Sequence, residues 1–290
     1  EIVTADGNIL QIDENNHTDL FWAIRGGGGN FGVVTKFKFQ LQDLTQAYGG
    51  ILCLPATPET IASFLSVADS APEALSTIAN VMPAPPMPFL AEEHYGKIII
   101  LAMMCYAGDV AEGEKAMQSF RNIATPLADL LHPMSYAELF PPDDTEYHPI
   151  AAGRTMFLDY VDESVAETIL NHLSKATGMM SVTQLRVLGG AMARVPEDAT
   201  AYAHRKSKIM ANLAVLYEDI NDKTVHEKWV DEFQNAIQQS DKGAYVNFIN
   251  TVGEDELKSA YPTSTLGKLR QVKSKYDPEN LFKMNQNIKP

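Results

Sequence analysis

The sequence predicts an α+β fold in which helices back one face of a β-sheet. Beyond about residue 45, strand-like apolar runs alternate with amphipathic stretches of helical length. The composition, 45% hydrophobic and 21% charged, is that of an ordinary globular chain. Strands and helices in these numbers favour a sheet with its helices on one face. The expected strands are 46–54, 76–82, 97–106, 153–160, 183–188, 208–217 and 244–250, and the expected helices are 58–70, 110–123, 163–176 and 222–239.

The amino-terminal segment shows shorter elements. Residues 1–12 are typical of two short strands around a turn-forming Asp-Gly pair. Thr18 or Asp19 can cap a short helix, which we expect over residues 19–24 and which a run of glycines then ends. Apolar and polar residues alternate from 33 to 41, and this alternation predicts a half-buried strand.

Charge, hydropathy and metal-ligand spacing exclude several classes of function. A net charge of −14 argues against a nucleic-acid partner, because phosphate binding needs clustered Lys and Arg. The longest apolar run, residues 98–107, is half of the roughly twenty residues that a membrane span needs. The histidines are scattered, and Cys53 and Cys105 lie in separate apolar runs without a CxxC pair, so no metal site is expected. Both cysteines are typical of small buried hydrophobic residues.

The glycine cluster matches GxGxxG at Gly27, Gly29 and Gly32, but its context does not fit a nicotinamide-dependent dehydrogenase. A dinucleotide-binding loop follows a strand and opens a helix, so that the helix amino terminus faces the pyrophosphate. Here the helix precedes the glycines and the strand follows them. The glycines therefore either allow a sharp turn of the backbone or let a cofactor approach it closely.

The longer string from Asp19 to Thr35, DLFWAIRGGGGNFGVVT, resembles the signature of berberine-bridge-enzyme-like flavoproteins. These proteins form part of the vanillyl-alcohol-oxidase and p-cresol-methylhydroxylase (PCMH) superfamily of FAD enzymes. Three further strings resemble the same family in the same order: LGGAMARVPEDATAYAHR at 188–205, AYVNF at 244–248 and YDPENLFKMNQNI at 276–288. Together the four strings extend the resemblance over the whole chain.

The resemblance implies a domain organisation. Residues 1–42 would end a PCMH-type FAD-binding domain, 43–240 would form a substrate domain with an antiparallel sheet backed by helices, and 241–290 would return to the FAD-binding domain. The chain opens at Glu1 rather than at a methionine or a signal segment. We therefore expect a carboxy-terminal portion of a longer flavoprotein, and we expect FAD to be absent from this fragment alone. Self-association through the exposed surface of the FAD-binding domain would then be possible.

The resemblance also implies which residues contact the cofactor. Glycines permit close approach of the backbone, and amide side chains can match both the donors and the acceptors of a flavin pyrimidine ring. The alternative for the terminal amides is a polar tail in solvent. The expected cofactor-binding residues are Gly28, Gly29, Gly32, Val33, Val34, Tyr245, Asn247, Asn285, Gln286 and Asn287.

Three residues resemble positions near the substrate: Asn212, His204 and Phe248. Relatives often place tyrosine, sometimes histidine, where Phe248 stands, and that residue helps to deprotonate the substrate. Phenylalanine cannot transfer a proton, so another group acts as the base, the base lies upstream, or the chemistry differs or is absent. No catalytic residue is therefore assigned. For His204 a structural hydrogen-bonding role has equal weight.

The function implied is oxidation of an alcohol or an activated C–H group of a small molecule, of the sugar or secondary-metabolite class, by hydride transfer to FAD. The alternative is a fragment of the same fold that binds a ligand without turnover. The sequence does not distinguish a cytoplasmic from a secreted protein, and it does not identify the substrate or the electron acceptor.

Overall fold

The computed structural model describes residues 1–44, 46–140, 149–284 and 286–290. The chain divides into two compact units. Unit 1 consists of residues 1–42, 191–206 and 242–290, and unit 2 consists of residues 43–190 and 207–241.

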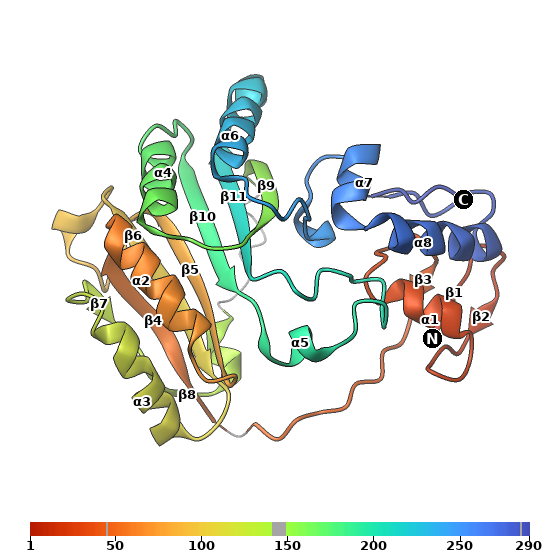
Figure 1. The fold of residues 1–290 in the computed structure, drawn as a ribbon, viewed down its shortest axis with the longest axis horizontal. Helices are drawn as coiled ribbons and strands as arrows, with labels where there is room; N and C mark the ends of the chain where they lie inside the picture. Colours follow the sequence, from red (N-terminus) through yellow and green to blue (C-terminus); the bar gives the residue numbers. More distant parts are fainter. Residues whose placement is uncertain (45, 141–148, 285) are drawn as a thin grey trace. The chain divides into compact units, whose positions relative to one another are not determined.

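Unit 2 is built on an antiparallel sheet with the strand order β7-β4-β6-β5-β10-β11-β9, and β8 pairs with β4 beside this path (Figure 1). Every pairing among the described strands is antiparallel. Strands β5 and β6 pair over nine residues, as do β9 and β11, and β4 and β6 pair over eight. The strands are β4 (Ala47–Pro55), β5 (Leu75–Pro83), β6 (Ile98–Tyr106), β7 (Ala128–Asp129), β8 (His132–Met134), β9 (Ile150–Leu158), β10 (Met180–Val187) and β11 (Ile209–Tyr217).

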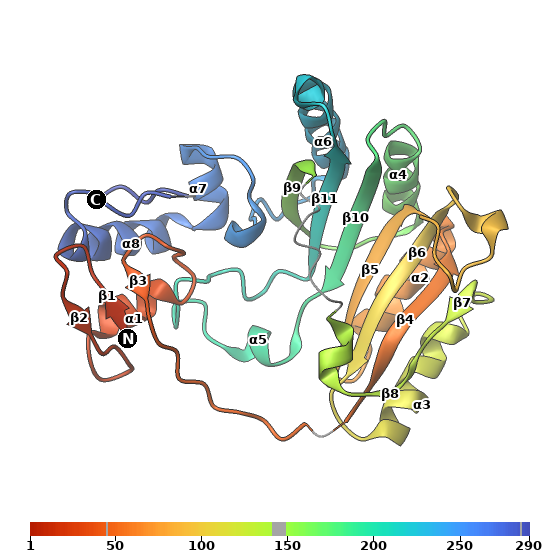
Figure 2. The ribbon, with the colours of Figure 1, turned by 180° about the vertical axis from the view of Figure 1, so that it is seen from behind.

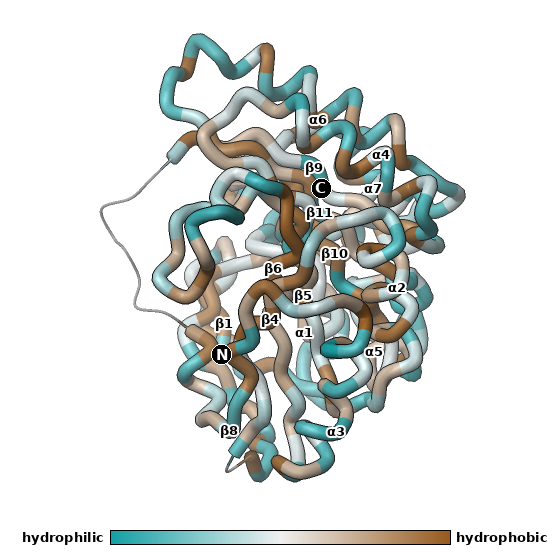
Figure 3. The backbone as a smooth tube through the Cα atoms, turned by 90° about the vertical axis from the view of Figure 1, so that its left-hand side faces the viewer, coloured by the Kyte–Doolittle hydropathy of each residue, from teal (hydrophilic) through white to brown (hydrophobic). Residues whose placement is uncertain are grey.

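Four helices cover one face of this sheet, and Figure 2 views the sheet from the side away from them. They are α2 (Pro58–Asp69), α3 (Val110–Arg121), α4 (Glu163–Leu173) and α6 (Lys223–Ile237). Phe64, Phe120, Ile169 and Phe233, one from each helix, belong to a single buried cluster with alternate residues of the strands. Hydrophobic residues accordingly run along β5 and β6, whereas α6 alternates between hydrophobic and hydrophilic positions (Figure 3). The α+β prediction, with an antiparallel sheet backed by helices, is confirmed.

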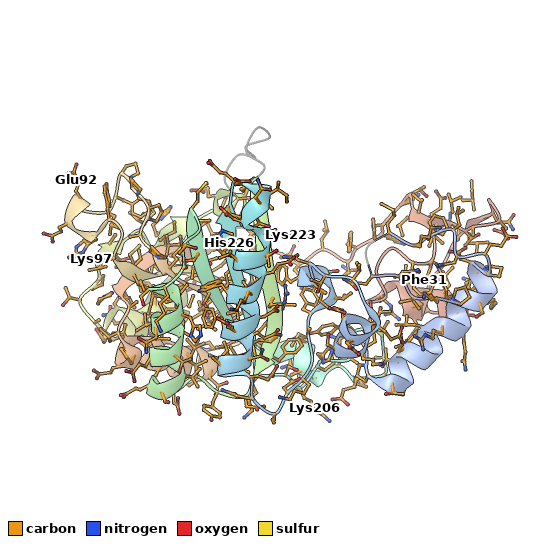
Figure 4. The ribbon with its side chains drawn as sticks, turned by 90° about the horizontal axis from the view of Figure 1, so that it is seen from above. Phe31, Glu92, Lys97, Lys206, Lys223 and His226 are labelled. Carbon is orange, nitrogen blue, oxygen red and sulfur yellow. The ribbon has the colours of Figure 1, made fainter. Side chains whose placement is uncertain are left out.

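Local sequence explains where these helices begin. The Thr57 hydroxyl accepts a hydrogen bond from the Thr60 N–H. Pro58 occupies the first turn of α2, where a backbone N–H would have no partner within the helix. The Asp109 and Asp162 carboxylates cap α3 and α4 in the same way. On α6, His226 is buried with its ring 4.5 Å from that of Tyr217, so the role of this histidine is packing in the interior of unit 2 (Figure 4).

Unit 1 has a three-stranded sheet in the order β2-β1-β3, with β1 (Ile2–Val3), β2 (Ile9–Leu10) and β3 (Val33–Val34). Its helices are α1 (Thr18–Ile24), α7 (Glu254–Ala260) and α8 (Thr263–Tyr276), and the short α5 (Gly190–Arg194) leads from unit 2 into it. Phe31, labelled in Figure 4, is 1% exposed and packs in a core that includes Leu20, Leu269 and Ile288.

Two predicted strands and one predicted cap are wrong. The segment expected as a strand over 33–41 pairs only at Val33–Val34, because β1 offers it two residues and no other described strand continues the pairing. Residues 244–250 form a short 3₁₀ turn at Val246–Phe248 rather than a strand. The helix expected over 19–24 is present, but it begins one residue earlier, at Thr18. Neither Thr18 nor Asp19 caps it, since His17 occupies the cap position in a left-handed conformation.

The division of the chain also differs from the expected one at residues 191–206, which were expected within the substrate domain. These residues pack with unit 1. The indole N–H of Trp22 donates to the Asp198 carbonyl, and the Tyr202 N–H donates to the Arg25 carbonyl. Backbone groups of residues 191–206 are therefore hydrogen-bonded to the carboxy-terminal end of α1.

Candidate functional site

The glycines that follow α1 fall into two groups by what surrounds them. A Cβ at Gly26 would lie 2.3 Å from the Tyr202 nitrogen, and one at Gly32 would lie 2.4 Å from the Val3 carbonyl oxygen. These contacts are packing requirements of unit 1 itself. A Cβ at Gly29, in contrast, would meet nothing within 4 Å, and one at Gly28 would meet only the Asn30 amide at 3.8 Å. Gly28 and Gly29 therefore present bare backbone to open space.

Asn30 joins the glycine loop to the end of the chain. Its side chain is 2% exposed, and its amide donates to the carbonyls of Gly27 and Gln286, both at 2.9 Å. Its side-chain oxygen accepts from the Ile288 N–H at 2.9 Å. Each hydrogen bond of this side chain is thus made to the backbone of the glycine loop or of the carboxy-terminal tail. These bonds hold the loop against the tail, although 256 residues separate Asn30 from Gln286.

A buried ion pair supports the same junction. The Lys273 ammonium on α8 lies 2.6 Å from the Asp277 carboxylate, and both side chains are fully buried. Lys273 also donates to the carbonyls of Asn30 and Phe282. Burial disfavours the charged Asp277 carboxyl, but the Lys273 ammonium and the N–H groups of Leu281 and Phe282 outweigh this and hold its pKa below the ordinary value. Sequence reasoning missed Asn30, Lys273 and Asp277 as parts of the site.

A cavity of about 410 Å³ opens between these segments. It is lined by Gly28, Gly29, Asn30, Val246, Asn247, Ile249, Asn250, Val252 and Gln286. A second cavity of about 270 Å³ shares Gly28, Val246 and Asn247 with the first, and adds Ile24, Arg25, Gly26, Tyr202 and Tyr245. The sequence predicted that Asn247 and the terminal amides would lie together, and Asn247 and Gln286 do line one cavity.

Tyr245 and Asn247 lie together for a different reason from the expected one. The strand expected over 244–250 would have placed both on one face, but the chain turns at 246–248 and brings the Asn247 amide to donate to the Tyr245 hydroxyl at 2.7 Å. The Tyr245 ring also makes edge contacts with Tyr202 and Phe248, at centroid distances of 5.9 and 5.4 Å. The turn therefore places an aromatic group and an amide at the cavities together.

The carboxy-terminal amides are held by the fold rather than lying free in solvent. Gln286 is 5% exposed, and its amide nitrogen donates to the Thr251 carbonyl at 2.6 Å. Its side-chain oxygen and that of Asn287 are buried without a hydrogen-bond partner among the described residues. Asn285 lies outside the described residues. The tail is anchored by fully buried Ile288, whereas Leu281 is 61% exposed.

The remaining predicted residues are spread over the two units. Val33 and Val34 form β3 beside β1, with Val33 55% exposed. The His204 Nε2 hydrogen-bonds to the Ala260 carbonyl at 2.9 Å, which ties this ring to the end of α7. Asn212 lies in unit 2 on β11, paired with Gln184 and Thr155 on the neighbouring strands.

The two cysteines lie inside the core of unit 2. Cys53 and Cys105 are buried free thiols, and burial raises the pKa of Cys53 to about 11, so this thiol is a poor nucleophile. The described residues contain no group of three or more potential metal ligands. None of the described helices combines the length and the apolar character that a bilayer span requires.

Known proteins similar to this chain include FAD-linked oxidoreductases and BBE-like structures. The family model described as "Berberine and berberine like" matches residues 244–289. An FAD-linked oxidoreductase of Dictyostelium discoideum is 27% identical over 301 residues, covering 100% of this chain and 62% of that protein. The chitooligosaccharide oxidase of Gibberella zeae is 26% identical, again covering 100% of this chain and 62% of its own length. The wild-type BBE-like 1 structure of Physcomitrella patens superposes with a TM-score of 0.83 at 18% identity, covering 99% of this chain and 64% of that one.

Over its whole length the chain is similar to FAD-linked oxidoreductases. Residues 244–289 thus match the berberine and berberine-like family model, and the fold is that of a BBE-like structure. The chain spans a little under two thirds of the length of the curated relatives it matches.

The residues present fit part of a flavin site. Open space at Gly29 gives a planar group access to the backbone, and the unpartnered Gln286 oxygen offers an acceptor that is already desolvated. The described residues that line the cavities carry one formal charge, that of Arg25 in the smaller cavity. These features suit the edge of a ring system better than a diphosphate, which needs several donors or cations.

Proposed function

We propose that this chain works as part of an FAD-dependent oxidoreductase that oxidises an alcohol or an activated C–H group of a small molecule, of the sugar or secondary-metabolite class. The cavity that Gly28, Gly29, Asn247 and Gln286 share is the observation that carries the proposal. When bound, FAD supplies the two-electron chemistry, and the protein binds and orients the reactants.

The residues of the cavity have distinct proposed roles. The bare backbone of Gly28 and Gly29 allows close approach of the cofactor, while Gln286, held by Thr251, accepts a hydrogen bond from it. Asn287 contributes a second acceptor from the same tail. Gly32, Val33 and Val34 position the loop, since Gly32 packs against Val3. Asn247 orients Tyr245 at the cavity wall through their hydrogen bond.

A second candidate function is ligand binding without turnover, and Phe248 is the observation that favours it. Its ring lies against Tyr245 at the position where the family resemblance implies a proton-transferring group. A hydrocarbon ring cannot accept a proton from a substrate. Turnover therefore requires a base from elsewhere, and binding alone does not.

The visible absorption of the full-length protein tests the proposed function. We expect the purified protein to show a flavin spectrum, and we expect an alcohol substrate added without oxygen to bleach it, because hydride transfer reduces the flavin. A protein that stays colourless after incubation with FAD would contradict the proposal. A stable flavin spectrum that no member of a panel of sugars and aromatic alcohols bleaches would favour the non-catalytic alternative.

For the 290-residue chain alone, we propose that FAD binding is weak and that the chain associates with itself. Edge hydrogen bonds contribute about 0.5–1.5 kcal/mol each, while association costs about 4–15 kcal/mol. The exposed apolar side chains of unit 1 favour self-association, because burying them removes apolar surface from water. They are Ile9, Val33, Phe37, Phe39 and Leu41, between 55% and 82% exposed, with the rings of Phe37 and Phe39 stacked at 5.6 Å.

Analytical ultracentrifugation with added FAD checks both points in one run. Detection at a flavin-absorbing wavelength reports bound FAD, and the protein signal reports the mass. We expect oligomers that sediment without stoichiometric flavin. A monomer that carries one FAD per chain would overturn both the weak binding and the self-association.

A further inference from the structure

Asn30 occupies a position in unit 1 that calls for a side-chain amide. Its nitrogen faces the carbonyl oxygens of Gly27 and Gln286, and its oxygen faces the Ile288 N–H, each at 2.9 Å. The side chain is 2% exposed, so these hydrogen bonds are made inside unit 1 rather than to solvent. The position needs two donated hydrogens and one acceptor within one planar group, and among side chains of this length only asparagine offers them.

The glycine loop is the fixed side of this contact. The Gly27 N–H donates to the Ala23 carbonyl of α1 at 2.8 Å, and a Cβ at Gly27 would lie 2.5 Å from the same oxygen. The Lys273 ammonium on α8 donates to the Asn30 carbonyl at 2.8 Å. Helices α1 and α8 therefore hold Asn30 in place, and Asn30 in turn holds the carboxy-terminal tail.

Gln286 is held both by its main chain and by its side chain. Its main-chain carbonyl accepts from Asn30, and its side-chain nitrogen donates to the Thr251 carbonyl at 2.6 Å. The nitrogen and the oxygen of an amide are bonded to the same planar carbon, so these two contacts together determine where the side-chain oxygen points. That oxygen is buried and has no hydrogen-bond partner in the described part of the chain.

The Gln286 oxygen differs from the other buried oxygens of this kind because its residue lies at a cavity. Buried side-chain oxygens without a partner among the residues that the structure describes also occur at Asn280, Asn287, Thr155 and Thr183. None of those four residues lines either of the two cavities, whereas Gln286 lines the larger one beside Asn30. A missing partner alone does not indicate a ligand, but a missing partner at an open cavity leaves room for one.

We propose that Asn30 is a positioning residue of the flavin site, which acts by directing the Gln286 side-chain oxygen at the cofactor. This role rests on the proposed function, in which that oxygen accepts a hydrogen bond from FAD. Asn30 acts through Gln286 rather than directly, because both hydrogens of its amide are already donated, to Gly27 and to Gln286. Removing the Asn30 amide therefore weakens flavin recognition only as far as Gln286 contributes to it.

A double-mutant cycle in the full-length protein tests this role. Asn30→Asp keeps the shape of the side chain and the acceptor for Ile288, but it places a second oxygen against the carbonyls of Gly27 and Gln286. Gln286→Met keeps the length of the side chain and removes its amide. Fluorescence titration gives the FAD affinity of the wild type, the two single variants and the double variant, and the visible absorption band of bound FAD is recorded for each.

We expect each single variant to bind FAD about tenfold more weakly than the wild type, as for the loss of about one hydrogen bond. The double variant should also bind FAD about tenfold more weakly, because the second substitution removes a contact that the first has already lost. Both single variants should shift the flavin absorption band in the same direction, since the same hydrogen bond to the ring is lost. A loss of about a hundredfold in the double variant would mean independent roles and would overturn the inference.

Tyr261→Phe is the matched control for a purely structural role. Tyr261 is 2% exposed, and the single hydrogen of its hydroxyl is donated to the Gly26 carbonyl at 2.9 Å, so this bond holds the glycine loop and not the tail. We expect Tyr261→Phe to lower the free energy of unfolding of unit 1, measured in urea, and to leave the FAD affinity and the absorption band unchanged. An equal loss of FAD affinity in Tyr261→Phe and Asn30→Asp would assign the effect to loop stability and overturn the inference.

Asn30→Ala is included because it removes the same donors without adding an oxygen beside the carbonyls. If neither Asn30 variant keeps unit 1 folded, Asn30 serves the fold alone and the inference is overturned. A wild-type protein that binds FAD while the effects of Asn30→Asp and Gln286→Met are additive would overturn the role of Asn30 and leave the proposed function standing. A wild-type protein that binds no FAD would contradict the proposed function itself, and this role with it.

Discussion

Replacing Lys273 with methionine is expected to lower the free energy of unfolding of unit 1 by about 3–5 kcal/mol, the cost of leaving one partner of a buried ion pair unpaired. Methionine keeps most of the length and volume of lysine, so the loss would come from charge and hydrogen bonding. The substitution leaves the Asp277 carboxylate buried and removes the donors to the carbonyls of Asn30 and Phe282. It should therefore loosen the glycine loop and the tail together.

Urea unfolding monitored by fluorescence measures this effect. The chain has two tryptophans, and Trp22 lies in unit 1 while Trp229 lies in unit 2. In a Trp229→Phe background the signal reports unit 1 alone. Lys258→Met is the matched control, because the Lys258–Asp255 pair is 61% and 96% exposed and such pairs contribute about 0–1 kcal/mol. Equal losses in the two variants would contradict the structural role of Lys273.

The large sheet and its helices could be predicted because their patterns are local and long. Helix α2, for example, carries a cap at Thr57, a proline in the first turn and apolar residues at Ile61, Phe64 and Leu65, all within one window of sequence. Strand β6 is a continuous apolar run from Ile98 to Tyr106. Both elements bury a face that the sequence pattern itself defines.

The two predicted strands that failed show the limit of the same reasoning. Alternation over 33–41 indicates a face to be buried, but a strand also needs a partner with free backbone groups. Phe37 and Phe39 are 65% and 75% exposed because no described strand lies beside them. At 244–250 the apolar and aromatic residues indicated a strand, but Asn247 closes a local bond to Tyr245 instead. Short polar side chains often compete with strand pairing in this way.

The junction of the candidate site could not be predicted from local pattern. Lys273 on α8 and Asp277 directly after it are four residues apart, a spacing that usually indicates an exposed ion pair. What buries them comes from Asn30, 243 residues earlier, and from the tail that follows. The resemblance pointed to the glycines and the terminal amides. It gave no reason to distinguish Gly28 and Gly29, which open on the cavity, from Gly26 and Gly32, which pack inside unit 1.

Gly29→Leu is expected to weaken FAD binding to the full-length protein about 10- to 100-fold while leaving the fold intact. A Cβ at Gly29 meets nothing within 4 Å, so the new side chain would extend into the cavity rather than into unit 1. If a flavin occupies that space, the two would overlap, and overpacking of this kind costs about 1–3 kcal/mol, equivalent to the stated range at 1.4 kcal/mol per tenfold. Gly267→Leu is the matched control, because Gly267 is an exposed glycine of α8 whose Cβ would also meet nothing within 4 Å.

The measurement is fluorescence titration of the full-length apoprotein with FAD for the wild type and these two variants. The proposed site predicts that Gly267→Leu binds FAD like the wild type and that Gly29→Leu loses at least one order of magnitude in affinity. Wild-type affinity in Gly29→Leu, with unit 1 equally stable in all three proteins, would show that FAD does not bind at the cavity between the glycine loop and the carboxy-terminal tail.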